Sequence, residues 1–245
     1  MSDVLIECHD VAVGYDKPVL EHVNLQIMRG EIVALLGGSG CGKSTFLRAI
    51  SGLLPPLHGD VKLFGESLYD QGVNERRALL RRTGMAFQQD ALFSSMTIED
   101  NVALPLRELT KLPEPIITEM VRLKLAMVGL AGLERRLPSN LSGGQRKRAA
   151  LARASILDPE LIFCDEPSAG LDPVISVGID QTLLELRDVL GCTIVVVSHE
   201  LDSIKTISDR AVMFADGGVV ADGTIDELAH SQEEAVFEFF HARAG

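Results

Sequence analysis

Apolar and polar residues are arranged along this chain in a way that predicts an alternation of strands and helices. Residues 4–8, 11–13 and 23–27 are short apolar-rich segments separated by turns. The third of them alternates between apolar and polar side chains, as a half-buried strand does. Together these segments predict an antiparallel β layer at the start of the chain.

Three later runs are almost entirely apolar, which is typical of strands buried on both faces. They cover residues 31–36, 161–164 and 194–197, and helical patterns follow at 44–50, 173–190 and from 200 on. Residues 112–137 differ, because apolar positions recur with a mostly helical period behind two prolines. We expect that stretch to form a separate helical lobe with its own small core.

A glycine-rich segment joins the first buried strand to the first helix and has the spacing G-x-x-x-x-G-K-[ST]. It consists of Gly37, Gly38, Ser39, Gly40, Cys41, Gly42, Lys43, Ser44 and Thr45. Glycines let successive N–H groups turn toward phosphate oxygens, and a helix N-terminus adds partial positive charge. Lys43 would reach the outer phosphates and Ser44 would bind Mg²⁺. The alternative is a turn without a ligand, and the flanking strand and helix argue against it.

Polar residues that could act in catalysis or metal binding follow the other two buried strands. Asp165 and Glu166 end the second run, and His199 follows the third. Ligands gather at the carboxyl edge of open α/β sheets, so Asp165 would suit Mg²⁺ and Glu166 would orient an attacking water. Surface acids at a strand end are common, and a lone histidine is more often structural. Because His199 is expected at the same sheet edge, we favour its contact with the terminal phosphate.

Two further features are compatible with nucleotide binding. Ser142, Gly143, Gly144 and Gln145 precede a strong helix and form a second candidate anion site. Tyr15 lies at the tip of the β layer, where its ring either stacks on a purine or is simply exposed in a turn.

Composition limits the class of protein. The formal net charge of −12 argues against nucleic-acid binding, which needs a basic face. No apolar run approaches the length of a membrane-spanning helix, and the first residues lack the features of a signal peptide. The four cysteines are scattered singly, which favours reduced thiols in the cytosol.

In this order the motifs resemble those of the ATP-binding-cassette (ABC) transport ATPases over nearly the whole chain. Residues 37–45 resemble the Walker A motif, residues 161–166 resemble Walker B with its glutamate, and residues 141–145 match the signature sequence. The fold implied is α/β: a P-loop NTPase with a parallel core sheet, an antiparallel β layer and an inserted helical lobe. The implied division is a core of residues 1–88 and 160–245 with a lobe at about 89–159.

The resemblance also implies roles for single residues. Lys43, Glu166 and His199 are the expected catalytic residues, with Glu166 as the base. ATP would be bound by Tyr15, by Gln88 and by the phosphate loop, and Mg²⁺ by Ser44, Gln88 and Asp165. Residues 168–172 resemble the loop that crosses a dimer, with Gly170 where alanine is commoner, so the role of Asp172 is less firm.

A single chain cannot complete the implied mechanism. In this family Ser142, Gly143, Gly144 and Gln145 complete the ATP site of a second subunit, so that two nucleotides are enclosed in a head-to-tail homodimer. The dimer would drive membrane-spanning permease subunits on separate chains, at the cytoplasmic face of the inner membrane. Two alternatives are a soluble ABC ATPase of DNA repair or translation and a phosphate-loop kinase, which leaves residues 141–145 unexplained.

The substrate is suggested by a narrower resemblance. Residues 87–93, 100–106 and 112–115 are similar to the ATPases of the Mla and related MCE-protein phospholipid-transport systems. This implies a permease that moves phospholipid and serves an MCE-type lipid-binding protein; an importer of amino acids or ions is the alternative. Five apolar residues in this region either form a groove for a permease helix or pack locally: Leu92, Phe93, Val102, Leu104 and Leu106.

Overall fold

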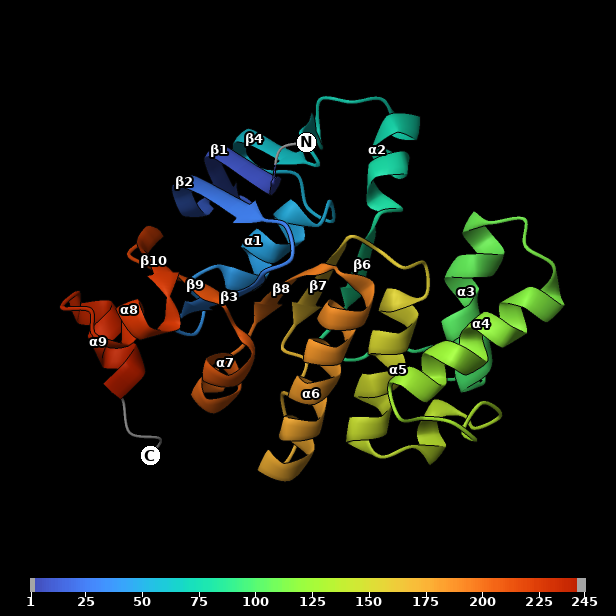
Figure 1. Ribbon diagram of the computed structural model, residues 1–245. Coiled ribbons are helices and arrows are strands. Elements are labelled where there is room, and N and C mark those ends of the chain that lie inside the picture. The colour runs from blue at the N-terminus through green and yellow to red at the C-terminus, as the bar shows by residue number, and fades with distance from the viewer. Residues whose placement is uncertain (1–2, 242–245) are drawn as a thin grey trace. The chain divides into compact units, whose positions relative to one another are not determined.

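The computed structural model describes residues 3–241, and its contacts divide them into two compact units (Figure 1). The first unit contains residues 3–80 and 193–241, and the second contains residues 81–192. The sequence-based division into a core and a lobe at about 89–159 follows motifs rather than contacts, and it stays a prediction.

The first unit contains the expected antiparallel layer. Strands β1 (Val4–Gly14), β2 (Pro18–Met28), β4 (His58–Leu63) and β5 (Glu66–Ser67) are ordered β2-β1-β4-β5. The prediction of two strands at 4–8 and 11–13 is wrong, because β1 is continuous. Its pairing with β2 shifts between Cys8 and Val11, and Asp10 there has a φ of 50°. Such a bulge breaks the alternation without ending the strand.

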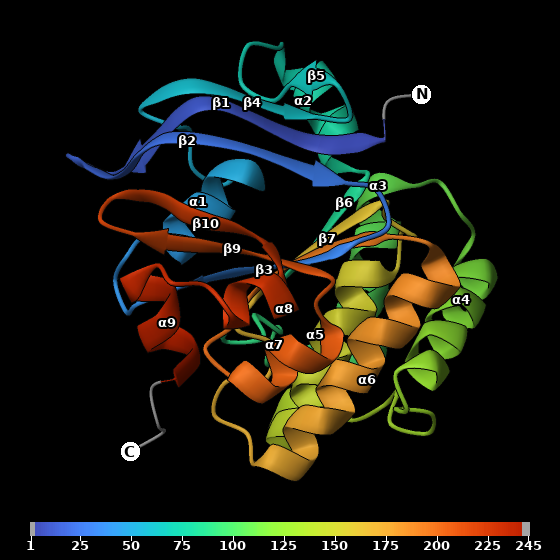
Figure 2. The same ribbon diagram turned by 60° about the vertical axis from the view of Figure 1, so that its left-hand side comes forward.

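A second group of strands in the first unit surrounds the glycine-rich segment. Its order is β10 (Gly218–Thr224), β9 (Arg210–Ala215), β3 (Ile32–Gly37) and β8 (Thr193–Val197). Strand β3 is parallel to both β8 and β9, and every residue of β3 and β8 is buried. Figure 2 shows α1 (Lys43–Ile50) lying between this group and the antiparallel layer. The remaining helices of the unit are α2 (Val73–Leu80), α7 (Leu201–Ile207), α8 (Ile225–Ala229) and α9 (Glu234–His241).

The second unit combines two parallel strands with helices. Strands β6 (Thr83–Ala86) and β7 (Leu161–Asp165) pair side by side. The helices are α3 (Ile98–Leu109), α4 (Glu114–Met127), α5 (Gly143–Ser155) and α6 (Pro173–Leu190), with a 3₁₀ turn at Pro138–Asn140. Thr97 caps α3, Pro115 lies in the first turn of α4 and Ser142 caps α5, so each start is encoded locally.

The helical part of the second unit has its own hydrophobic core, as predicted. Buried side chains from α3, α4 and α5 pack together, among them Val102, Val121, Leu125 and Ala149. Parallel strands, an antiparallel layer and a helical cluster confirm the α/β fold class. Within residues 3–241, no helix is both long and apolar enough to cross a bilayer.

Candidate functional site

The glycine-rich loop connects β3 to α1 within the first unit. Gly37, Gly40 and Gly42 have φ values of 142°, 78° and 105°, which favour glycine. A β-carbon on Gly37 would also lie 2.4 Å from the carbonyl oxygen of Phe214. Gly38, in contrast, has open space where a β-carbon would be. The loop therefore needs glycine for its own backbone and leaves room beside it for a ligand.

The start of α1 fits a phosphate group. Gly42 is its N-cap residue and supplies no side-chain hydrogen bond to the N–H groups of the first turn. These N–H groups are the donors that bind anions at helix N-termini. Lys43 is 5% exposed, and its Nζ donates to the carbonyl oxygens of Gly37 and Gly38 at 2.8 Å each. The ammonium group is thus held over the loop by main-chain carbonyls.

Tyr15 and His199 also belong to the first unit. Tyr15 lies between β1 and β2 with 62% exposure, and its hydroxyl accepts a hydrogen bond from Arg48 at 2.8 Å. His199 is exposed and follows β8, whose end is paired with Leu35 beside the end of β3. His199 therefore lies at the same strand edge as the phosphate loop, as predicted from the pattern of the strands.

The other predicted catalytic groups are in the second unit, at the end of β7. Asp165 is the last residue of this buried strand and is 6% exposed. Glu166 follows with a φ of 49°, an uncommon conformation for a non-glycine residue. Gln88 Nε2 donates to Glu166 Oε2 at 2.8 Å. The amide oxygen of Gln88 takes no part in this hydrogen bond. Cys164 directly precedes Asp165 in β7. Burial raises the pKa of its thiol, so this cysteine stays neutral.

The signature residues form the start of α5. Ser142 Oγ accepts from the N–H of Gln145 at 3.3 Å, and the Gln145 side chain accepts from the N–H of Ser142 at 3.0 Å. This reciprocal pair is a capping box. A β-carbon on Gly144 would lie 2.4 Å from Ile175 Cγ2, so this glycine also lets α5 pack against α6.

The loop at residues 168–172 leads into α6. Gly170 has a φ of 78°, where an alanine would be strained. The side chain of Asp172 accepts from the N–H groups of Val174 and Ile175 at 3.1 Å each. Asp172 is therefore the N-cap of α6, a structural task that the sequence-based interpretation did not assign to it.

One buried lysine near these groups was missed by the sequence analysis. Lys147 is 7% exposed on α5, and its Nζ donates to the carbonyl oxygen of Gln88 and, at 3.4 Å, to that of Glu166. It also forms an ion pair with Asp90 at 3.4 Å. A signal was present, because Lys147 shares the buried helical face of Ala150 and Ala154. The sequence analysis predicted a strong helix here and assigned no role to Lys147.

The five apolar residues singled out between residues 92 and 106 do not form one continuous exposed surface. Val102 and Leu106 are buried in the core of the helical cluster, and Leu92 packs against it. For these three residues the alternative of local packing holds, because Val102 and Leu106 on α3 face α4 and α5 and Leu92 packs against the same cluster. Leu104 is partly buried, whereas Phe93 is 52% exposed.

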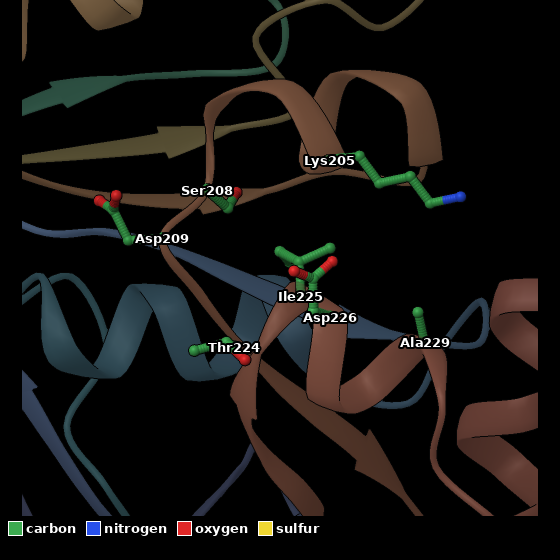
Figure 3. A pocket seen from close by; sticks show the side chains of 7 residues that line it. All are labelled: Lys205, Ser208, Asp209, Thr224, Ile225, Asp226 and Ala229. Atoms are coloured by element: carbon green, nitrogen blue, oxygen red, sulfur yellow. The ribbon is translucent and has the colours of Figure 1, made fainter.

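A surface cavity of about 460 Å³ lies apart from these motifs within the first unit (Figure 3). Two of the polar side chains that line it accept hydrogen bonds from main-chain N–H groups. Thr224 Oγ1 accepts from the N–H of Glu227, and Asp209 accepts from the N–H of Ile32. Lys205 extends away from both residues in Figure 3. The arrangement offers no group of catalytic side chains.

The predicted site residues thus form two sets. Lys43, Ser44 and His199 belong to the first unit, and Gln88, Asp165 and Glu166 belong to the second. The hydroxyl, amide and carboxylate oxygens of Ser44, Gln88 and Asp165 are ligands of the kind that Mg²⁺ prefers. Their joint binding of one ion stays a prediction.

Comparisons with known proteins agree with the motifs. The family model described as ABC transporter matches residues 20–169. The chain is 43% identical to the intermembrane phospholipid transport system ATP-binding protein MlaF of Haemophilus influenzae, covering 98% of this chain and 91% of that protein. It is 41% identical to the probable ribonucleotide transport ATP-binding protein mkl of Mycobacterium tuberculosis, covering 92% of this chain and 63% of that protein.

A solved structure supports the same assignment. The dimeric, post-hydrolysis state of the ATP-binding cassette MJ0796 bound to ADP and Pi has a TM-score of 0.81 with this chain and 30% identity, covering 90% of this chain and 98% of that one. Sequence identity and fold agree over most of the chain. The chain therefore belongs to the ABC transporter family, as one of its ATP-binding and ATP-hydrolysing subunits.

Proposed function

We propose that this subunit drives a phospholipid transporter, acting as a homodimer on permease subunits in the inner membrane. The observation that carries the proposal is the 43% identity to MlaF, which extends over 98% of the chain. The matched part of the chain includes residues 87–115, whose sequence resembles that of the Mla ATPases. The chain would be a peripheral protein at the cytoplasmic face of the membrane.

Each predicted site residue of the first unit has a distinct proposed task. Lys43 binds the outer phosphates, and the N–H groups of the phosphate loop and α1 surround the remaining phosphate oxygens. The exposed ring of Tyr15 stacks on the adenine. His199 contacts the terminal phosphate from the end of β8.

The chemistry is assigned to residues of the second unit. Glu166 takes a proton from the water that attacks the terminal phosphorus, while its hydrogen bond to Gln88 orients the carboxylate. Ser44, Gln88 and Asp165 are the proposed ligands of Mg²⁺, whose charge would offset the negative charge on the transferred phosphoryl group. Gln88 would therefore connect the metal site to the carboxylate of Glu166, because it binds one and is hydrogen-bonded to the other.

The dimer is proposed because the signature residues resemble those that complete the ATP site of a second subunit in this family, and because the similar cassette MJ0796 is dimeric. Ser142, Gly143 and Gly144 present the N-terminus of α5, a helix of 13 residues with no acidic side chain in its first turn. ATP held by Lys43 of one subunit would meet these residues of the other. Hydrolysis would then remove the bridge between the two subunits and open the dimer.

The permease is proposed to contact two exposed aromatic residues that lie on either side of Gln88 in the sequence. Phe87 and Phe93 are 37% and 52% exposed, and large apolar side chains at a surface favour a partner. Phe93→Asp should abolish co-purification with the permease but leave the ATPase activity of the isolated subunit unchanged. Retention of the permease by this variant would contradict the proposed contact.

Phospholipid transport is tested by deleting the gene in its own organism. We expect a disturbed outer-membrane lipid distribution and lower detergent resistance, both restored by the wild-type gene and not by a Glu166→Gln allele. The identity to mkl makes ribonucleotide transport the second candidate. Loss of ribonucleotide uptake, or of uptake of an amino acid or ion, with a normal lipid profile would contradict the lipid assignment. The MCE-type lipid-binding protein is expected to co-purify only when the permease is present.

A further inference from the structure

Helix α5 connects the signature residues to the loops that carry Gln88 and Glu166. The connection runs through Lys147, which lies on the buried face of the helix and is 7% exposed. It is three residues beyond Gly144, a distance of about 4.5 Å along a helix axis. Burying an ammonium group is unfavourable unless carbonyl or carboxylate oxygens surround it, and here two carbonyls and one carboxylate do.

The two loops held by Lys147 have unusual backbones. Asp90 and Glu166 have φ values of 60° and 49°, which are unfavourable for these residue types and persist only where surrounding contacts enforce them. Arg153 strengthens the first loop, since its guanidinium donates to the carbonyl oxygens of Asp90 and Ala91 at 2.9 and 2.7 Å. Lys147 differs from Arg153 because its ammonium bonds both loops.

The ammonium also lies next to a contact between side chains. Gln88 Nε2 donates to Glu166 Oε2 at 2.8 Å, and the carbonyl oxygens of these same two residues accept from Lys147. The backbones of both residues are therefore fixed relative to α5. A shift of α5 would displace the backbones of Gln88 and Glu166 together.

We propose that Lys147 is a positioning residue that links the signature end of α5 to Gln88 and Glu166. When a nucleotide held by the partner subunit binds Ser142 and Gly144, Lys147 carries the resulting shift of α5 to the glutamate. The inference rests on the roles proposed above for Gln88 and Glu166. It explains how the catalytic loop of one subunit responds to the ATP bound by the other.

The chain offers a matched control for the test. Lys124 on α4 is also 7% exposed in the second unit, and its Nζ pairs with Asp158 at 2.8 Å. Lys147→Met and Lys124→Met each remove one buried ammonium and keep an unbranched side chain. We expect Lys147→Met to lower kcat for ATP about 10-fold to 100-fold, because the glutamate is no longer aligned. ATP affinity without Mg²⁺ should stay within about twofold of wild type, because Lys147 contacts loops rather than nucleotide.

Two further variants separate positioning from loss of folding. Lys147→Arg keeps a cation at this place and should recover most of the lost kcat. Asp90→Asn removes the carboxylate partner and should lower kcat in the same direction, and in the double variant the two effects should not add. If Lys147→Met does not fold, Asp90→Asn with unchanged kcat is enough to reject the proposal.

The outcomes distinguish this inference from the proposed function. Equal effects of Lys147→Met and Lys124→Met on kcat, or a loss of ATP affinity with normal kcat, would overturn the positioning role. Glu166→Gln serves as the reference in the same assay. If Glu166→Gln retained wild-type hydrolysis, the proposed role of Glu166 itself would be wrong.

Discussion

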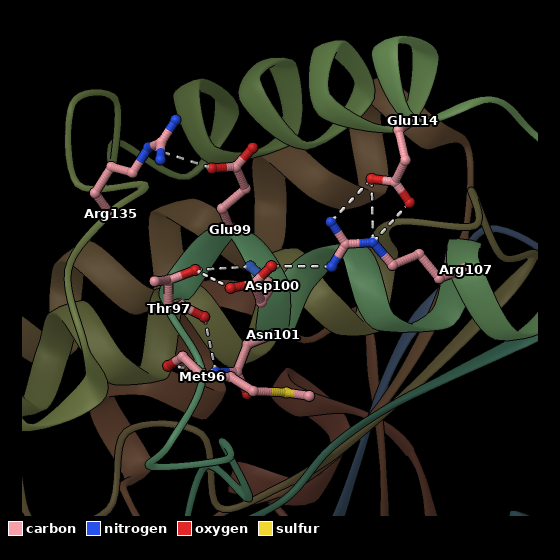
Figure 4. A network of polar contacts seen from close by, with 8 residues as sticks. All are labelled: Met96, Thr97, Glu99, Asp100, Asn101, Arg107, Glu114 and Arg135. Atoms are coloured by element: carbon pink, nitrogen blue, oxygen red, sulfur yellow. Dashed lines mark hydrogen bonds and ion pairs between the residues drawn. The ribbon is translucent and has the colours of Figure 1, made fainter.

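Asn101 holds the loop that carries Phe93, and its removal should destabilise the second unit. The side chain is fully buried. Its Oδ1 accepts from the N–H of Phe93 at 2.7 Å, and its Nδ2 lies 2.9–3.3 Å from the carbonyl oxygens of Thr97, Phe93 and Met96. Figure 4 shows Asn101 pointing from α3 toward the Met96–Thr97 turn.

The expected loss follows from these bonds. A primary amide offers two donor hydrogens, so Asn101→Ala removes about three full hydrogen bonds. At about 1 kcal/mol each, with the partly buried N–H of Phe93 left without its acceptor, the free energy of unfolding should fall by about 3–5 kcal/mol. For a chain of this size that corresponds to a melting temperature lower by about 10 °C.

Thermal unfolding followed by circular dichroism measures this loss. Asn24→Ala is the matched control, because Asn24 also bonds main-chain groups, those of Asp10 and His22, but is exposed. The control should lose less than about 1 kcal/mol. An Asn101→Ala protein that melts within about 2 °C of wild type would refute the assignment of these hydrogen bonds.

Three other predictions concern the first unit. Lys43→Ala removes the cation over the phosphate loop and should abolish tight ATP binding, since a charge-assisted hydrogen bond contributes about 1.5–3 kcal/mol; unchanged affinity in a nucleotide-binding titration would contradict its role. Gly37→Ala places a β-carbon 2.4 Å from the Phe214 oxygen and should lower both the melting temperature and ATP affinity, whereas Gly30→Ala, which meets no atom within 4 Å, should spare ATP affinity. Asp10 bonds to His22 at 2.7 Å and raises the pKa of His22 above 6.5. The resulting stabilisation is present below pH 6.5 and is lost as the pH rises through the raised pKa, so the stability difference between wild type and His22→Asn should shrink as the pH rises above 6.5. Asparagine tolerates the φ of 54° at this position, and a difference independent of pH would contradict the ion pair.

The parts of the fold that depend on neighbouring residues were predictable from sequence. An apolar run, a glycine loop and a helix identify β3, the phosphate loop and α1 because each is specified within a few residues. The same holds for the capping box that starts α5, in which Ser142 and Gln145 are three residues apart.

The parts that depend on distant residues were not predictable. Lys147 bonds to Gln88 and Glu166, which are 59 and 19 residues away in the chain, so its contacts have no local signature. Likewise, apolar positions on α3 fit either a core or a docking groove. The packing of α4 and α5 against Val102 and Leu106 decides for the core.

If ATP bridges two copies of this chain, the Glu166→Gln protein should double in mass when ATP binds. Glutamine keeps the size of the side chain but does not accept a proton from water, so hydrolysis should fall by about 10²-fold or more while ATP remains bound. Light scattering after size-exclusion chromatography in ATP and Mg²⁺ should give twice the chain mass of 26.5 kDa, and adding Lys43→Ala should restore the single mass. A Glu166→Gln protein that binds ATP and still has a mass of 26.5 kDa would show that ATP does not bridge two copies of this chain.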